Sequence, residues 1–303
     1  MDLDRRAGTI AAGITVVLWA SAFVGIRAAA EDLSAGPLTL GRLVVGALAL
    51  GTIVALRGDA LPPRSDVPRL VLCGLLWFGA YNVLLNAAEQ RIDAGTAAML
   101  VNVGPVFLAI LAGLLLHEGF PRSLVAGCAI AFGGAIVIGL ATSERGVDAG
   151  WAAALCVAAA AAYAGGVVAQ KPLLERSSGL QITFLACVVG AVACLPFTPA
   201  LVDELGAAPA GSIAWTVYLG VFPTAIGFTT WAYALARTSA GKMGATTYLV
   251  PPITVLMGWA LLGETPPALA LLGGALCLVG VAVTRGLRPR LRPAPTRASR
   301  PAP

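Results

Sequence analysis

Charged residues are scarce in this chain, and the residue types that build catalytic or metal sites are thinly represented. Only 12% of the 303 residues are Asp, Glu, Lys or Arg, and His117 is the single histidine. The six cysteines include no Cys-x-x-Cys pair, so they indicate packing rather than a metal site or disulfide framework. No Gly-x-Ser-x-Gly, phosphate-loop or dinucleotide-binding pattern is present. The sequence therefore favours a protein that is not an enzyme and uses no cofactor or metal.

Apolar sequence is what the chain has in abundance. Hydrophobic residues make up 58% of it, and the mean hydropathy is +0.86. Runs of about 20 apolar residues, the length that crosses roughly 30 Å of hydrocarbon, recur from end to end. We predict an all-α integral membrane protein with ten transmembrane helices and no soluble domain. The ten predicted spans are 8–29, 37–57, 69–90, 94–116, 122–141, 150–171, 179–198, 212–236, 241–262 and 267–285.

The basic residues predict how these spans are oriented. Placing the N-terminus inside the cell puts every Lys and Arg on the cytoplasmic side of the plasma membrane except Arg27, Arg42, Arg91 and Arg145. Both termini are therefore predicted to be cytoplasmic. Residues 286–303, rich in Arg, Pro and Ala, are predicted to form a disordered basic tail near anionic lipid. The net charge of +5 is thus interpreted as topology and lipid contact, not nucleic-acid binding.

Part of the sequence occurs twice. Residues 91–137 recur without a gap as 237–283, and the two copies belong to halves at 8–141 and 150–285 with five predicted spans each. Because five is odd, the second half is predicted to insert with the opposite orientation. The expected fold is two inverted five-helix repeats, which is typical of secondary transporters. Shared charged and Pro residues include Arg91/Arg237, Pro105/Pro251, Glu118/Glu264 and Pro121/Pro267.

Short motifs occur in matching order in the two halves. The first half contains Trp19-Ala-Ser-Ala-Phe23, Arg42, Ala94-Gly95, Pro105 and Leu116-His-Glu118. The second half contains Ala240-Gly241, Pro251 and Leu262-Gly-Glu264. In the order, spacing and duplication of these motifs, residues 8–285 resemble the EamA family of the drug/metabolite transporter superfamily. The resemblance implies ten helices in two repeats, and export or exchange of small metabolites.

Three kinds of paired residue are predicted to have structural roles. Pro105 and Pro251 each remove a backbone donor within a span and so bend it, either to shape a transport cavity or only as a packing kink. Glu118 and Glu264 precede a helix, where a carboxylate caps the N-terminus, and we favour this role over proton coupling. Small residues two helical turns apart allow close packing of two helices, or of two protomers in a homodimer. The residues predicted to pack in this way are Gly127, Gly134, Gly273 and Gly280.

Polar and aromatic side chains inside the spans are the candidate binding residues, because each is costly in hydrocarbon unless it faces protein or water. Two pairs among them are repeat-equivalent, as a site at the midplane between inverted repeats requires. The alternative is hydrogen bonding between helices for the amides and interfacial anchoring for the aromatics. Glu89, near the outer end of its span, is expected at the solvated surface. The residues predicted to line a cavity and contact a solute are Trp19, Trp77, Tyr81, Asn82, Asn102, Tyr163 and Tyr248.

The first and sixth predicted helices contain no Asp or Glu near mid-span. The small multidrug resistance branch of the same superfamily exchanges cations for protons through such a carboxylate, so that mechanism is disfavoured. A cavity lined by aromatic and amide groups suits a neutral or zwitterionic solute, such as an amino acid. We therefore predict a secondary transporter that exports such metabolites by alternating access. The alternatives are a multidrug or organic-cation efflux transporter, and a membrane protein with a structural or receptor role and no transport.

Overall fold

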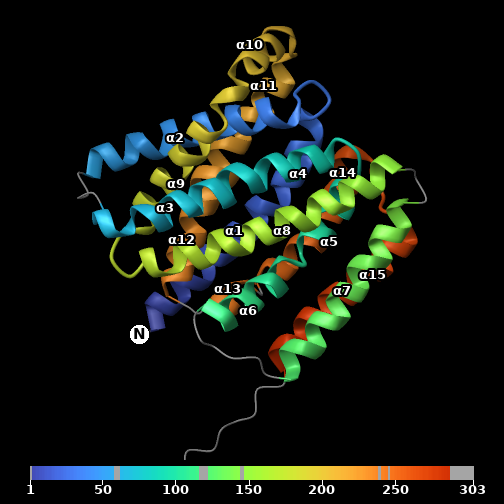
Figure 1. Ribbon diagram of the computed structural model, residues 1–303. Helices are drawn as coiled ribbons and strands as arrows, with labels where there is room; N and C mark the ends of the chain where they lie inside the picture. The colour runs from blue at the N-terminus through green and yellow to red at the C-terminus, as the bar shows by residue number, and fades with distance from the viewer. Residues whose placement is uncertain are drawn as a thin grey trace, which may run out of the picture.

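The chain is represented by a computed structural model that describes residues 2–57, 62–115, 122–143, 147–237, 240–244 and 246–286, and all regular structure in these ranges is helical (Figure 1). The first half contains α1 (Asp2–Ala29), α2 (Ala35–Arg57), η1 (Arg64–Asp66), α3 (Val67–Cys73), η2 (Gly74–Ala80), α4 (Tyr81–Glu89), α5 (Ala94–Val101), α6 (Gly104–Leu115) and α7 (Arg122–Ser143). The second half contains α8 (Val147–Leu173), α9 (Gly179–Ala193), η3 (Leu195–Phe197), α10 (Thr198–Ala207), α11 (Ala210–Leu219), η4 (Gly220–Gly227), α12 (Phe228–Ala236), α13 (Ala240–Gly244), η5 (Thr246–Leu249), α14 (Val250–Leu262) and α15 (Ala268–Gly286).

The lengths and apolar surfaces of these helices suit a membrane. Six of the described helical segments are long and apolar enough to span it, or up to seven if α9 and α10, which are bent by 53° at their junction, form one span. Val250–Leu262 and Ala268–Gly280 are apolar but shorter. Large hydrophobic side chains such as Leu48, Leu56 and Trp259 are exposed on the outside of the bundle, as contact with lipid requires. The protein is therefore a multi-pass membrane protein, while the count of ten spans remains a prediction.

The helices that open the two halves, α1 and α8, run in opposite directions. Arg27, near the end of α1, reaches the backbone oxygen of Glu89 at the end of α4, so α1 runs in the same direction as α3–η2–α4. Arg176, which follows the end of α8, lies 3.5 Å from Asp66, which precedes α3. The end of α8 thus meets the start of α3, and α8 runs against this helix and against α1.

The two halves contact each other in a reciprocal pattern. Helix α1 of the first half packs on α14 and on α11–η4–α12 of the second half. Helix α8 of the second half packs on α6 and on α3–η2–α4 of the first half. Likewise, α2 packs against η4 and α9 against η2. The last helices of the halves, α7 and α15, lie side by side at the edge of the molecule (Figure 1). Exchanging the halves preserves these contacts, as a pseudo-two-fold arrangement requires.

Two of the expected spans contain a π-helical segment. Gly74–Ala80 (η2) interrupts the third expected span, and Gly220–Gly227 (η4) interrupts the eighth. Gly74 and Gly220 are separated by the same number of residues as the repeated pair Arg91 and Arg237, so the two segments are equivalent. Wide turns of this kind leave backbone carbonyls with altered partners and are frequent at functional sites.

The paired prolines begin new helices, and this corrects the expectation that they bend continuous ones. A turn at Asn102 and Val103 separates α5 from α6, so Pro105 falls in the first turn of α6. Pro251 likewise falls in the first turn of α14, which follows the 3₁₀ segment η5. Proline is tolerated in a first turn because the backbone N–H there has no acceptor within the helix.

Glycine allows α7 and α15 to approach at backbone distance. A Cβ on Gly134 would lie 2.6 Å from the carbonyl oxygen of Gly273, and a Cβ on Gly273 would lie 2.8 Å from that of Gly134. Gly127 and Gly280 are also buried on these two helices. The close contact at Gly134 and Gly273 is therefore one between two helices of the same chain.

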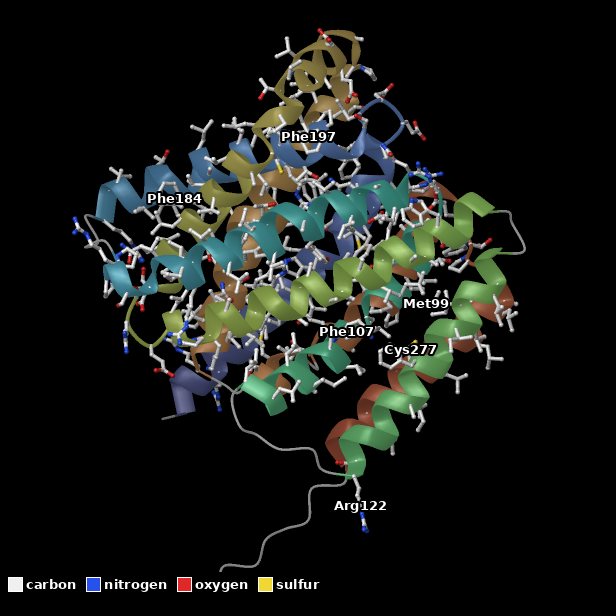
Figure 2. All side chains as sticks on the ribbon, in the orientation of Figure 1. Met99, Phe107, Arg122, Phe184, Phe197 and Cys277 are labelled. Carbon is white, nitrogen blue, oxygen red and sulfur yellow. The ribbon has the colours of Figure 1, made fainter. Side chains whose placement is uncertain are left out.

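The α7–α15 pair joins the rest of the bundle through large apolar side chains. Met99 of α5 is buried and packs over Gly274 of α15. Phe107 of α6 contacts Phe132 of α7, with 5.5 Å between the ring centroids. Figure 2 shows Met99 and Cys277 in the region where the bundle meets this pair. The pair therefore lies beside the helices that enclose the cavity described next.

Candidate functional site

A cavity lies between the two halves of the molecule. It is lined from the first half by α1, α2, η2 and α4–α6, and from the second by α8, α12, η5 and α14. Its empty space, with the open solvent at its mouth included, is about 620 Å³. Most lining groups are apolar or aromatic, and a few are polar. The cavity therefore has the lining that is typical of a site for a small organic molecule.

An aromatic cluster closes one end of this cavity. The rings of Trp19 and Trp231 stack at 4.9 Å between centroids, and Trp77 meets Trp19 edge-on at 6.0 Å. Phe228 and Tyr163 complete the cluster, at 4.9 and 5.5 Å from Trp77. These residues come from α1, η2, α8 and α12, so both halves contribute. Stacked and edge-on pairs of this kind contribute about 0.5–1.5 kcal/mol each beyond the burial of their area, so they stabilise this end of the cavity.

The cavity extends from this cluster toward the end of α1. Ile26 of α1 and Leu85 of α4 both lie farther along their helices than the cluster and line the cavity. On the other side of the cluster, the hydroxyl oxygens of Thr15 and Thr230 are 2.8 Å apart, so α1 and α12 are in contact there. Among the described residues, the cavity therefore extends from the aromatic cluster toward the end of α1.

Five of the seven residues predicted to line a cavity do so in the structure. These are Trp19, Trp77, Tyr81, Asn102 and Tyr163. Tyr248 has its backbone in η5, next to the lining residue Thr247, and its side chain lies outside the described residues.

Asn82 is the exception and corrects the prediction. It is buried but does not line the cavity. Its side-chain nitrogen donates to the carbonyl oxygens of Trp77 (3.2 Å) and Phe78 (2.8 Å), which both belong to the π-helical segment η2. Because the π-helix gives these carbonyls altered partners, the amide of Asn82 serves the local backbone. We do not retain it as a residue that binds solute.

Two hydrogen-bond donors of the cavity wall have no acceptor among the described residues. They are Nε1 of Trp19 and Nδ2 of Asn102, and both atoms are buried. Buried polar groups are nearly always hydrogen-bonded, so an unpaired donor on a cavity residue is a candidate to bind an acceptor atom of a ligand. Nε1 of Trp19 faces Gly227 of η4, which does not line the cavity, so Asn102 is the better candidate. Asn102 is free to face the cavity because it ends α5 at the break before Pro105.

Arg42 is a cavity residue that was not predicted from the sequence. Arg42 lies two turns into α2, is only 3% exposed, and lines the cavity. Its Nε and Nη2 donate to the hydroxyl of Thr224 in η4, at 3.2 and 3.1 Å. No acidic side chain of the described residues lies within ion-pair distance of it. The available signal was a lone arginine two turns inside an apolar helix, which is rarely tolerated without a partner or a function.

Glu264 links three elements at the end of the bundle toward which the cavity extends. Its Oε1 accepts from Nε of Arg27 at 2.7 Å, and its Oε2 accepts from the backbone nitrogen of Ala94 at 3.2 Å. Glu264 thus contacts the N-terminus of α5, rather than that of the helix that follows it in sequence. Its repeat partner Glu118 lies outside the described residues.

Glu89 is fully buried, which contradicts its predicted place at the solvated surface. Residues near the end of a span were assumed to reach water. Here, however, the connecting segments cover the helix end. Gln90 donates to the carbonyl of Leu33 in the loop after α1, and Arg27 donates to the backbone oxygen of Glu89 at 3.4 Å.

Relatives of this chain are transporters by name. A relative from Streptantibioticus cattleyicolor, named a probable terminal-alkyne amino-acid exporter, is 43% identical over 88% of this chain and 90% of its own length. An uncharacterized transporter of Bacillus subtilis is 31% identical over 91% and 90%. A probable amino-acid metabolite efflux pump of Salmonella typhimurium is 25% identical over 92% and 94%.

The fold and the family are also shown by comparison. A protein of known crystal structure superposes with a TM-score of 0.66 over 93% of this chain and 98% of its own, at 17% identity, so it shares the fold. The family model for EamA-like transporters matches twice, at residues 6–140 and 150–286. This chain, with its two repeats around one cavity, belongs to the EamA-like transporter family.

Proposed function

We propose that this protein exports small neutral or zwitterionic metabolites, amino acids among them, across the plasma membrane by alternating access. The observation that carries the proposal is Arg42, a buried arginine that has no acidic partner among the described residues and lines a cavity with mainly apolar and aromatic walls. A fixed positive charge beside apolar walls suits a solute with one carboxylate and an apolar part.

Each part of such a solute has a complementary group in the cavity. The guanidinium of Arg42 offers a charge-assisted donor to the carboxylate. The unpaired donor of Asn102 offers a further hydrogen bond to an acceptor atom. The rings of Trp77 and Tyr163 can contact the apolar side chain of the solute. An amino acid uses all three kinds of contact.

The same wall is unfavourable to organic cations. None of the residues that line the cavity is acidic, and Arg42 adds a positive charge to it. A cation would therefore lack a counter-charge and would be repelled by the guanidinium. The names of two relatives, an amino-acid exporter and an amino-acid metabolite efflux pump, point to the same class of solute.

The proposed topology has ten spans in two inverted repeats, 8–141 and 150–285, with both termini in the cytoplasm. The opposite directions of α1 and α8 and the reciprocal contacts of the halves support the inversion. With this orientation the aromatic cluster of Trp19 and Trp77 lies on the cytoplasmic side of the cavity. The present conformation then has its solute space on the extracellular side of that cluster.

Ligand-induced thermal stabilisation of the purified protein tests the class of solute. At a ligand concentration 100 times Kd, a molecule that binds only the folded state adds about 2.7 kcal/mol of stability. We expect zwitterionic amino acids with apolar side chains to raise the melting temperature. The matching amines, which lack the carboxylate, and lipophilic cations should not. Stabilisation by amines and cations without amino acids would favour the organic-cation alternative.

Two asparagine variants separate binding from packing. Asn102→Leu should weaken this stabilisation and leave the ligand-free melting temperature unchanged, because Nδ2 of Asn102 has no hydrogen-bond partner among the described residues. Asn82→Leu should lower the ligand-free melting temperature, because the bonds to Trp77 and Phe78 are lost, each worth about 0.5–1.5 kcal/mol. Unaltered ligand stabilisation in Asn102→Leu would remove Asn102 from the site.

A further inference from the structure

Glu89 is a buried carboxyl group that the proposed solute contacts leave unused. Its side chain is fully buried, and neither Oε1 nor Oε2 has a hydrogen-bond partner in the described structure. It lies on α4 one turn beyond Leu85 and two turns beyond Tyr81, both of which line the cavity. An unpartnered carboxyl group therefore lies just beyond the cavity wall.

The cationic side chains near Glu89 form hydrogen bonds with other groups. Arg27 donates its Nε to Glu264 and contacts only the backbone oxygen of Glu89. Arg42 donates to Thr224. The ionisable groups that act electrostatically on the Glu89 carboxyl, or on which it acts, come from several of the helices and connecting segments around it. They are Arg27 of α1, Arg42 of α2, Tyr81 of α4, Asp93 before α5, Cys156 of α8 and Glu264 after α14.

The surroundings of Glu89 favour a protonated carboxyl group. An ionised Glu89 would place a negative charge in a fully buried site without a hydrogen-bond donor among the described residues, and such a charge is costly to bury. The arrangement in this conformation is therefore that of a neutral carboxylic acid.

From this geometry we propose that Glu89 binds and releases one proton in each transport cycle, so that solute movement is coupled to proton movement. This inference rests on the proposed transport function and goes beyond it by naming the coupling ion and its residue. The proton enters as H⁺ from one aqueous side, forms an O–H bond with a carboxylate oxygen of Glu89, and leaves as H⁺ to the other side. No other bond is made or broken.

Loss of the proton from Glu89 can change the ion pair between Arg27 and Glu264. When Glu89 loses its proton, its carboxylate competes with Glu264 for Arg27, which already reaches the Glu89 backbone at 3.4 Å. Turning Arg27 toward Glu89 weakens the tie between α1 and the segment after α14. Since Glu264 also holds the N-terminus of α5, the change affects the packing of three elements at this end of the cavity.

The wild-type protein in liposomes gives the first test, with a pH-sensitive dye trapped inside and a radiolabelled amino acid as solute. We expect the solute gradient to change the internal pH. We also expect a pH difference to drive solute accumulation when imposed in one orientation and depletion in the other. Solute flux that is the same in both orientations and without a pH difference, with no change in dye signal, would overturn the proposal.

Glu89→Gln gives the second test, because glutamine has the shape of the protonated acid and cannot release a proton. The variant should exchange labelled for unlabelled solute, since Glu89 is not on the cavity wall, and should lose pH-driven accumulation and the dye signal. The control is Glu31→Gln, at an exposed carboxylate of the same end of the bundle, which should behave as wild type. If a pH difference still drives solute accumulation in Glu89→Gln, another group carries the proton.

The two proposals fail in different ways. Absence of solute exchange in the wild type would contradict the transport of amino acids itself. Exchange in the wild type without any proton movement would contradict only the role of Glu89. If Glu89→Gln yields no folded protein, the wild-type dye measurement decides alone whether protons move with the solute.

Discussion

Replacing Arg42 with methionine is expected to remove most of the affinity for amino-acid solutes. Hydrogen bonds to charged groups contribute about 1.5–3 kcal/mol, which corresponds to a loss of affinity of roughly 10- to 100-fold. Arg42→Lys retains the charge without the planar fork of donors, so its affinity should fall between the two. The loss should be visible for solutes with a carboxylate and absent for analogues that lack it. Calorimetric titration of the purified protein measures these affinities.

The matched control for this variant is Arg91→Met. Arg91 lies in the turn after α4 and is exposed, and its Nη1 donates to the backbone oxygen of Ala87 in α4. Arg91 is not among the residues that line the cavity. We expect wild-type affinity in this control. Equal affinity in Arg42→Met and Arg91→Met would show that the guanidinium of Arg42 does not bind the carboxylate.

Replacing Gly134 with leucine is expected to destabilise the packing of α7 on α15. The new Cβ would lie 2.6 Å from the carbonyl oxygen of Gly273 and 2.7 Å from the backbone nitrogen of Cys277, so the helices must move apart. Overpacking of this kind typically costs about 1–3 kcal/mol. The melting temperature and the monodisperse yield in detergent should both fall.

Gly133 provides the control on the neighbouring residue of the same helix. A Cβ on Gly133 meets nothing within 4 Å, so Gly133→Leu changes helix propensity without a clash. Its melting temperature should equal or exceed that of the wild type. A similar fall in both variants would mean that the loss comes from the glycine itself and not from the contact with Gly273.

Much of the fold could be predicted from the sequence, because lipid imposes strong constraints on composition. The apolar runs predicted the positions of the helices, since only a helix satisfies its own backbone in hydrocarbon. The repeated Pro105 and Pro251 predicted related irregularities in the two halves. Their form could not be predicted, because a break before a proline and a bend at it have the same sequence signal. The π-helices η2 and η4 likewise have no known signal in the composition of their residues.

The site was predicted only in part, for physical reasons that differ between residues. Aromatic residues such as Trp19 and Trp77 could be predicted to line a cavity, because a ring with a polar atom is costly inside a span unless it faces protein or water. Asn82 was misassigned because an amide can serve a cavity or the adjacent backbone, and only the path of the backbone decides. Glu89 was misplaced because its burial depends on loops that are distant in sequence. Arg42 was missed as a cavity residue because its place depends on η4 of the other half, where its partner Thr224 lies.

Counterflow of a labelled amino acid in proteoliposomes tests the central claim most directly, namely that this chain carries zwitterionic solutes through the cavity between its halves. Vesicles preloaded with unlabelled amino acid should transiently accumulate the label with the wild-type protein and with Arg91→Met. Arg42→Met should accumulate far less label at low solute concentration. Wild-type uptake no greater than that of protein-free vesicles across apolar and aromatic amino acids would contradict the account, and so would equal uptake by Arg42→Met.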